Sequence, residues 1–401
     1  MKIRKAMLAS PFLLLASGGL AQNAPKPETT ISYRPPADPA ASWSSYDRTK
    51  AGPLFAEATI EGRRAAVMVD TGVTFTTLDL GWIKQFSNGA EAQPTLRVAA
   101  TGGTTSAALG PVVELSLPSY DVHRLQTLAA DFSGIKSALS RPVDMALGMN
   151  VIGAGSLELD LGAGHWRFAP TGIRWPQAAT ARLLYTPDRY HSYIVIDIEG
   201  HVLRLGVDTG YDGGLMLTKN AATITGLFDR NPTTTVASAG LGGIAISTLA
   251  VPTKMKFGVS ELSNIPTEIE ADGGLPTQWK LDGLIGIDLL RQLHAVLDFP
   301  ASTFFYLPST EVSQAPDRAT IGIQSERKDG AWRIIHVMAN SPAAGAGWKS
   351  GERICAVSRV ERNKTIPQGT NTTWGVSSPG TKLKFKMCDG SIRRLTARNF
   401  Y

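Results

Sequence analysis

The chain contains the tripeptide Asp-Thr-Gly twice, and this repetition constrains its fold more than any other feature. Asp70-Thr71-Gly72 follows the apolar run 65–69, and Asp208-Thr209-Gly210 follows a similar run at 203–207. An apolar run that enters an acidic residue and stops at glycine predicts a buried strand that delivers a carboxylate to a tight turn. The sequence therefore predicts two such turns.

Other short motifs repeat at the same spacing. The two aspartates are 208 − 70 = 138 residues apart, and this offset also relates 60–62 to 198–200, 146–148 to 284–286 and 159–161 to 297–299. Agreement over about a hundred residues with almost no net insertion predicts a duplicated supersecondary unit. One chain then contains the two halves that a homodimer would supply.

Each Asp-Thr-Gly is also followed, 78 residues later, by an apolar-apolar-Gly motif (148 − 70 and 286 − 208). With these paired motifs, residues 50 to 308 resemble a retropepsin-like (pepsin/retropepsin-type) aspartic protease, in the form found in bacteria. The resemblance implies a mostly β fold with two pseudo-symmetric lobes in one chain, at residues 50–175 and 183–308.

The resemblance implies that Asp70 and Asp208 form a catalytic dyad. Two carboxylates that lie close together cannot both ionise cheaply, so they share one proton. The ionised partner takes a proton from the attacking water while the protonated one donates to the scissile carbonyl oxygen. The pair titrates as a unit, so neither role belongs permanently to one residue.

Four further residues are expected to support the dyad: Thr71, Gly72, Thr209 and Gly210. The resemblance implies that the threonines hydrogen-bond across the lobe interface and that the glycines let backbone N–H groups approach the carboxylates. The chain departs from the family after each glycine, where it has Val73-Thr74 and Tyr211-Asp212. We expect Tyr211 to be bulky where substrate passes and Asp212 to add a carboxylate near the dyad.

Two glycine-rich segments occupy the positions of the family's flaps. The tips are Gly102-Gly103 and Gly240-Leu241. These segments are either two flaps that fold over substrate or ordinary exposed turns.

Residues 319–401 differ in pattern from the rest and resemble a PDZ-like α+β domain. The run 339–354, with Ser341-Pro342-Ala343 and Gly351-Glu352, carries the resemblance. It implies that the loop Ile321, Gly322 and Ile323 offers N–H groups to a peptide C-terminal carboxylate. The alternative is a packing module with an occluded groove.

The two cysteines of the chain, Cys355 and Cys388, both lie in this C-terminal segment. An oxidising compartment would permit a bridge between them. Two buried free thiols are the alternative.

Residues 1–21 combine basic residues, an apolar core and a small-x-small pattern, which predicts an export signal; a membrane anchor is the weaker alternative. Residues 22–49, rich in Pro and Ala, are predicted to be a flexible tether. We therefore expect an exported protein of the bacterial periplasm or cell envelope, or a secreted one, with no transmembrane segment after signal cleavage.

Charge and motif content exclude several functions. Without the three basic residues of the signal, 40 − 3 = 37 basic residues face 34 acidic ones, which gives no electrostatic case for nucleic acid. The six histidines show no HExxH or short His-x-His spacing, so we expect no metal and no cofactor. Asp160 and Asp298 are predicted to be strand-end or surface residues.

The sequence thus predicts a monomeric aspartic endopeptidase that acts on a peptide or protein substrate, with a possible C-terminal peptide ligand on the PDZ-like domain. The rival interpretation is a catalytically silent peptide-binding protein of the cell envelope.

Overall fold

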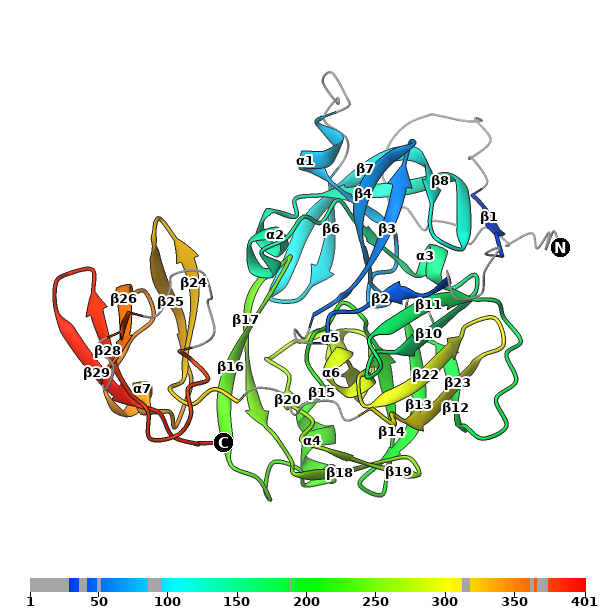
Figure 1. Cartoon of the computed structure of the whole chain (residues 1–401). Coiled ribbons are helices and arrows are strands. Elements are labelled where there is room, and N and C mark those ends of the chain that lie inside the picture. The colour runs from blue at the N-terminus through cyan, green and yellow to red at the C-terminus, as the bar shows by residue number, and fades with distance from the viewer. Residues whose placement is uncertain are drawn as a thin grey trace.

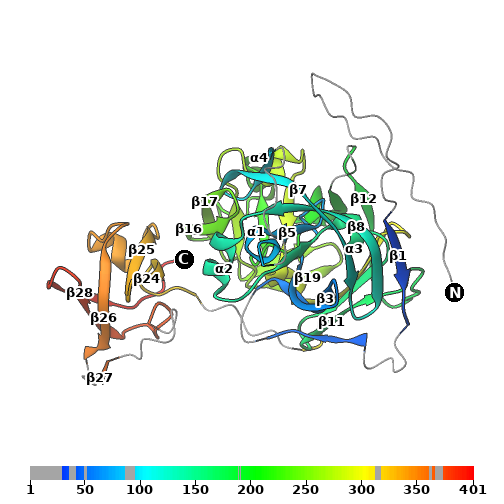
Figure 2. The ribbon, with the colours of Figure 1, turned by 90° about the horizontal axis from the view of Figure 1, so that it is seen from above.

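Strands dominate the structure, as the sequence predicts. The computed structural model describes residues 29–35, 42–48, 52–85, 95–187, 189, 191–311, 318–360, 364–365 and 374–401. Their strands form three sheets. In Figures 1 and 2, residues up to about 308 make the larger body, and the sheet near the C-terminus stands beside it.

The first sheet has eight strands and carries the first Asp-Thr-Gly turn. Its strands are β1 (Thr30–Tyr33), β3 (Leu54–Ile60), β4 (Arg63–Val69), β5 (Thr77–Asp79), β6 (Thr95–Ala100), β7 (Gly103–Ser116), β8 (Tyr120–Ala130) and β9 (Met145–Leu147).

The second sheet has fifteen strands and carries the second turn. Its strands are β2 (Ser44–Ser45), β10 (Ser156–Asp160), β11 (His165–Ala169), β12 (Ala179–Tyr185), β13 (Ser192–Ile198), β14 (His201–Val207), β15 (Leu215–Leu217), β16 (Thr233–Gly240), β17 (Gly243–Ala250), β18 (Lys254–Phe257), β19 (Ser260–Ser263), β20 (Thr267–Ile269), β21 (Gly283–Ile285), β22 (Leu293–Asp298) and β23 (Thr303–Pro308).

The third sheet has six strands: β24 (Ile323–Lys328), β25 (Ala331–Val337), β26 (Arg353–Arg359), β27 (Lys364–Thr365), β28 (Lys382–Met387) and β29 (Ile392–Thr396). The helices of the described residues are short: α1 (Leu80–Ile83), α2 (Ser133–Leu139), α3 (Met149–Ile152), α4 (Lys219–Thr225), α5 (Leu275–Gln278), α6 (Ile287–Leu290) and α7 (Pro342–Gly345).

The sequence repeat reappears as a repeat of elements. β3 and β4 begin 138 residues before β13 and β14 (192 − 54 and 201 − 63), and β9 and α3 begin 138 before β21 and α6 (283 − 145 and 287 − 149). Both hairpins turn at a Glu-Gly pair with positive φ, 50° and 74° at Glu61-Gly62 and 54° and 86° at Glu199-Gly200. Two successive residues with positive φ make the turn that matches strand twist, which explains why the pair recurs.

The two halves of the repeat, β3 to β11 and β13 to β23, share one sheet at their junction. β10 of the first half pairs antiparallel with β22 of the second, from Ser156 opposite Asp298 to Asp160 opposite His294. Asp160 and Asp298 both end their strands, as predicted. Asp298 is fully buried, not at the surface, and accepts hydrogen bonds from Thr171 Oγ1 and the Gly172 amide.

Two segments of the predicted tether, 30–33 and 44–45, are strands, so the prediction of a flexible tether is wrong for them. β1 pairs with β8 and β2 pairs with β11. Ile31 and Tyr33 pack against the core, and the Tyr33 ring meets Tyr120 edge-on at 5.4 Å. Apolar side chains at alternate positions therefore outweigh the Pro-rich composition. The predicted signal, 1–21, and the rest of the tether lie outside the described residues.

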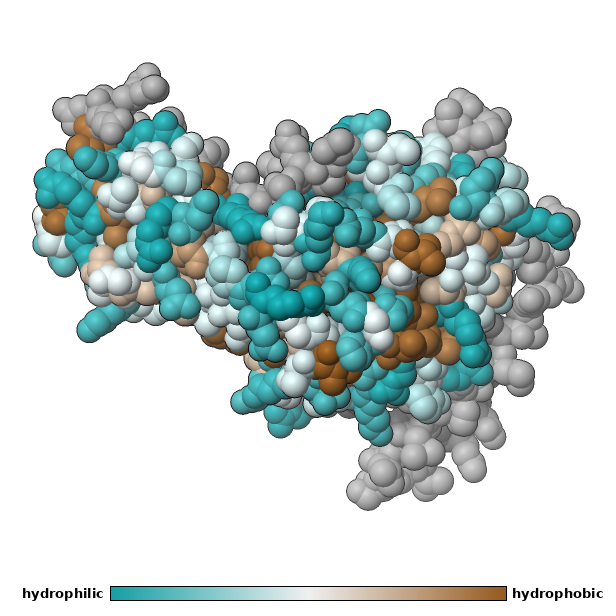
Figure 3. Space-filling view, turned by 90° about the horizontal axis from the view of Figure 1, so that it is seen from below, coloured by the Kyte–Doolittle hydropathy of each residue, from teal (hydrophilic) through white to brown (hydrophobic). Residues whose placement is uncertain are grey.

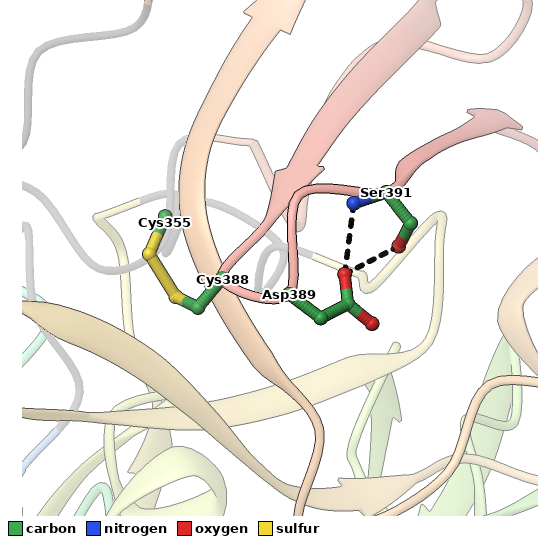
Figure 4. Close-up of a disulfide and its surroundings, with 4 residues drawn as sticks. All are labelled: Cys355, Cys388, Asp389 and Ser391. Carbon is green, nitrogen blue, oxygen red and sulfur yellow. Dashed lines mark hydrogen bonds between the residues drawn. A yellow bond between two sulfur atoms is a disulfide. The ribbon is translucent and has the colours of Figure 1, made fainter.

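The third sheet has its own core and a disulfide. Trp332, Trp374 and Phe385 are among its fully buried side chains. Cys355 and Cys388 are bridged between β26 and the end of β28 (Figure 4), so the disulfide, not the pair of thiols, is what the structure contains. Cys355 lies at a register shift between these strands.

Hydrophilic residues cover much of the lower face of both parts, and hydrophobic ones gather in patches on the larger part (Figure 3). Among the residues that the structure describes, no helix has the length and apolar character needed to cross a membrane.

Candidate active site

Each aspartate lies directly after a strand held on both sides. β4 pairs antiparallel with β3 and parallel with β9, and β14 has the same two neighbours in β13 and β21. The Asp70 amide donates to the Leu147 carbonyl at 3.0 Å, and the Asp208 amide donates to the Ile285 carbonyl at 3.0 Å. The apolar-apolar-Gly motif is thus the strand that anchors each turn, which explains the common 78-residue spacing.

The two turns hold each other through their threonines. Thr71 Oγ1 donates to the Val207 carbonyl at 2.7 Å and accepts from the Thr209 amide at 3.0 Å. Thr209 Oγ1 donates to the Val69 carbonyl at 2.7 Å and accepts from the Thr71 amide at 3.1 Å. These four buried bonds are reciprocal, so the halves meet here as the predicted threonine contacts require.

The glycines bring the two carboxylates together. The amides of Gly72 and Gly210 each donate to Oδ1 of their own aspartate at 2.9 Å. A Cβ on Gly72 would lie 2.6 Å from Asp208 Cγ, and a Cβ on Gly210 would lie 2.3 Å from Asp70 Oδ2. Each glycine therefore faces the opposite carboxylate at a distance that no side chain allows.

Burial raises the pKa values of both aspartates. Asp70 and Asp208 are 8% and 7% exposed. Burial, followed by the charge of Asp208, raises the pKa of Asp70 well above its usual range. Burial also raises the pKa of Asp208, although amide donors and the Asp70 side chain oppose it. The pair retains a proton at a pH where isolated aspartates would be ionised.

The hydroxyl of Tyr211 points into its own half of the repeat. The hydroxyl donates to Glu268 Oε1 at 2.8 Å, and Glu268 is only 5% exposed. A Cβ added to Gly213 would come within 2.2 Å of the Tyr211 hydroxyl oxygen, and one added to Gly286 within 2.4 Å of the ring. Two glycines therefore make room for the Tyr211 side chain, and the expectation that it is bulky where substrate passes stays a prediction.

Sequence reasoning missed Glu268, which links the dyad to a flap. The Tyr211 amide donates to Asp208 Oδ1 at 3.1 Å. Burial raises the pKa of Glu268 to about 7, while the hydroxyls of Tyr211 and of Ser247 on β17 lower it. An acidic residue between Thr267 and Ile269, in the short strand β20, was the available signal. Asp212, by contrast, is exposed, and its charge adds a smaller upward contribution to the pKa of Asp208.

The two predicted flaps are hairpins whose tips touch. β6 and β7 turn at 101–102, and β16 and β17 turn at 241–242. The Gly242 amide donates to the Thr101 carbonyl at 3.0 Å. A Cβ on Gly102 would come within 2.4 Å of Gly243, and a Cβ on Gly240 within 2.4 Å of Thr101. Gly103 likewise faces the Gly242 carbonyl, so small residues permit the contact between tips.

Leu241, at the tip of the second glycine-rich turn, contacts the first half of the repeat. The Leu241 side chain packs against a cluster of the first half that includes Phe132.

In the C-terminal domain, the loop residues Ile321, Gly322 and Ile323 are all buried. The carbonyls of Ile321 and Gly322 accept from the amides of Ala343 and Met338, and a Cβ on Gly322 would lie 2.1 Å from Ser341 Cβ.

Within the described parts of the chain, no group of three or more His, Cys, Asp or Glu side chains is placed to hold a metal ion.

Comparison with known proteins identifies one segment. No curated protein matches the sequence. A similar solved structure is the crystal structure of Basic 7S globulin from soybean, with 13% sequence identity, a TM-score of 0.41, and coverage of 72% of this chain and 98% of that chain. Residues 56–151 match the family model described as "Aspartyl protease". The first Asp-Thr-Gly turn thus lies within the segment that matches the aspartyl protease family model.

Proposed function

We propose that this protein is an exported, single-chain aspartic endopeptidase that cleaves peptide or protein substrates with the Asp70/Asp208 dyad. The observation that carries the proposal is the reciprocal hydrogen bonding of Thr71 and Thr209, which sets two buried carboxylates face to face. The aspartyl protease family domain at 56–151 supports the same reaction class. In this proposal, residues 50–175 and 183–308 are the two lobes.

The reaction uses one proton shared between two acids. The ionised carboxylate removes a proton from the water that attacks the peptide carbonyl, and the protonated carboxyl group donates to the developing oxyanion. Proton transfer to the leaving nitrogen then completes hydrolysis. The burial that raises both pKa values keeps the single proton on the pair in weak acid.

The test is hydrolysis of casein by the wild type and by Asp70→Asn and Asp208→Asn. We expect each substitution to lower kcat by at least about a thousandfold, because an amide cannot share the proton. The matched control is Asp272→Asn at an exposed aspartate of the second half, which should retain wild-type activity. Circular dichroism checks that every variant is folded. Most of the wild-type activity remaining in either dyad variant would exclude the dyad.

A single-chain enzyme should also have a specific activity that does not depend on its own concentration. Loss of specific activity on dilution would contradict a monomer. If the wild type binds pepstatin but hydrolyses no casein or peptide at any pH between 3 and 8, the rival proposal of a silent peptide-binding protein replaces this one.

Export is supported by the sequence pattern of residues 1–21 and by the Cys355–Cys388 disulfide, since such bonds persist in oxidising compartments. Periplasmic location in a bacterial host is tested by fractionation. Peptide capture by residues 321–323 is a weaker proposal, because their burial favours the packing-module alternative.

A further inference from the structure

The outer edge of the second flap is covered by the C-terminal domain. β16 pairs with β17 on one side only and ends its sheet, so its other edge would present free backbone groups. Gln324 of β24 meets that edge: its Oε1 accepts from the Ala237 amide at 2.7 Å, and its Nε2 donates to the Ala237 carbonyl at 3.0 Å. One side chain thus supplies both hydrogen bonds that a neighbouring strand would make.

The turn after β25 adds further bonds along the same edge. Thr234 Oγ1 donates to the Ala339 carbonyl at 2.6 Å, and Thr235 Oγ1 accepts from the Ala339 amide at 3.0 Å. Thr235 Oγ1 also lies 2.8 Å from His336 Nε2, and Asn340 Nδ2 donates to the Thr233 carbonyl at 3.0 Å. Contacts therefore run along β16 from residue 233 to 237.

Apolar side chains of the C-terminal domain also pack against the base of the β16–β17 hairpin. Leu249 and Val251 are buried with Met338, and Phe400 and Tyr401 pack against them. The chain end lies beside the lower part of β16 in Figure 1. Arg318 joins the same place, since its Nη2 donates to the Val251 carbonyl at 3.3 Å.

The tip of the first flap is more exposed than the tip of the second. Its outer strand β6 also ends its sheet, with β7 as its strand partner. Its tip glycines, Gly102 and Gly103, are exposed, whereas Leu241 and Gly242 of the second tip are half-buried. The C-terminal sheet lies beside β16 in both Figure 1 and Figure 2.

We propose that the C-terminal domain is a docking platform whose partner is the second flap of the same chain, residues 233–250. It holds this flap as a fixed wall of the cleft, and the first flap, residues 95–116, moves to admit the peptide. The inference rests on the proposed protease function for its consequence but not for the docking itself.

Hydrogen exchange of the full-length protein tests the docking without any proteolysis. We expect the amides of 233–237 to exchange at least about tenfold more slowly than those of 95–101, because the C-terminal domain forms hydrogen bonds with the outer edge of that segment. Gln324→Ala should speed exchange of 236–238 about tenfold, because two hydrogen bonds are lost. Thr234→Val, which keeps the side-chain shape, should act in the same direction. Lys328→Ala, at the exposed end of β24, is the matched control and should change nothing.

The kinetics of peptide hydrolysis test how the docking affects substrate binding. Gln324→Ala should raise KM for a peptide substrate several-fold, roughly threefold to tenfold, and change kcat less than about twofold, because an unfixed flap must be ordered when substrate binds. Equal exchange of the two flaps in the wild type, or unchanged exchange in both Gln324→Ala and Thr234→Val, would overturn the proposal. So would a lower kcat at unchanged KM.

The outcomes separate this inference from the proposed function. If exchange behaves as expected but casein and peptides are not hydrolysed, the docking platform stands and the protease proposal fails. If hydrolysis depends on Asp70 and Asp208 but the flaps exchange alike, the protease stands and the docking platform fails.

Discussion

The two halves of the repeat use one scaffold with different side chains beside the dyad. Leu78 of β5 pairs with Ala129, and the equivalent Met216 of β15 (216 − 78 = 138) pairs with Glu268. After the turn, the first half has Val73 where the second has Tyr211. At these positions the first half therefore has apolar side chains, and the second has the hydrogen bond between Tyr211 and Glu268.

This comparison distinguishes residues that contact the other half of the repeat from residues whose contacts lie within one half. The two threonines contact each other reciprocally and each glycine faces the aspartate of the other half, so a change in one half affects contacts of both. Tyr211 and Glu268 contact each other within one half, so they could change without a matching change in the first. The reciprocal residues should respond alike to substitution, and the others should not.

The largest effect is expected at the threonines. Thr71→Val or Thr209→Val keeps the side-chain shape, removes two hydrogen bonds and leaves buried partners unsatisfied. Each should lower the free energy of unfolding by roughly 4 kcal/mol and kcat by at least about tenfold. Urea unfolding and peptide hydrolysis measure both effects.

The symmetry of these two effects is the informative quantity. Losses that agree within about 1 kcal/mol support reciprocal roles, given the usual spread of such values. A large loss at one threonine with none at the other would show that a single half holds the interface. Thr223→Val, at an exposed threonine of α4, controls for the substitution itself.

The approach of Asp70 to Asp208, the threonine contacts and the two glycine-rich turns could be predicted because they lie at repeated positions in the sequence. The pairing of Tyr211 with Glu268 could not, since the residues are 57 positions apart and have no counterpart in the first half. The same holds for Gln324 and Ala237, 87 positions apart. The β10–β22 pairing, which joins the halves, could not be predicted either: both strands lie at repeated positions, but a sequence repeat does not show that its two copies pair with each other.

The second-largest effect is expected at Glu268, in the second half, whose contribution to the free energy of unfolding depends on pH. Burial raises the pKa of Glu268 from 4.5 to about 7, so in the folded protein the carboxyl group holds its proton to higher pH than in the unfolded chain. Its contribution to stability is full below about pH 4.5 and is lost as the pH rises through 7. Glu268→Gln should remove roughly 3 kcal/mol of this dependence.

The measurement is urea unfolding of the wild type and Glu268→Gln from pH 4 to pH 8. Other buried acids, the dyad included, contribute to both curves and cancel in the difference. Glu57→Gln, at an exposed glutamate of the first half, is the matched control. A difference between the wild type and Glu268→Gln that does not change with pH would exclude titration of Glu268 in this range.

The smallest effect is expected for Tyr211→Phe, which removes the hydroxyl that lowers the pKa of Glu268. A hydrogen bond to an ionised carboxylate contributes more than one to a neutral acid, so the substitution should cost about 2 kcal/mol at pH 8 and about 1 kcal/mol at pH 5. In the Glu268→Gln background the residue at 268 no longer ionises, so the cost should be the same at both pH values. A double-mutant cycle across the two pH values tests this pair directly. If the cost of Tyr211→Phe still rises with pH in that background, the hydroxyl interacts with another acid, and the dyad beside it becomes the first group to examine.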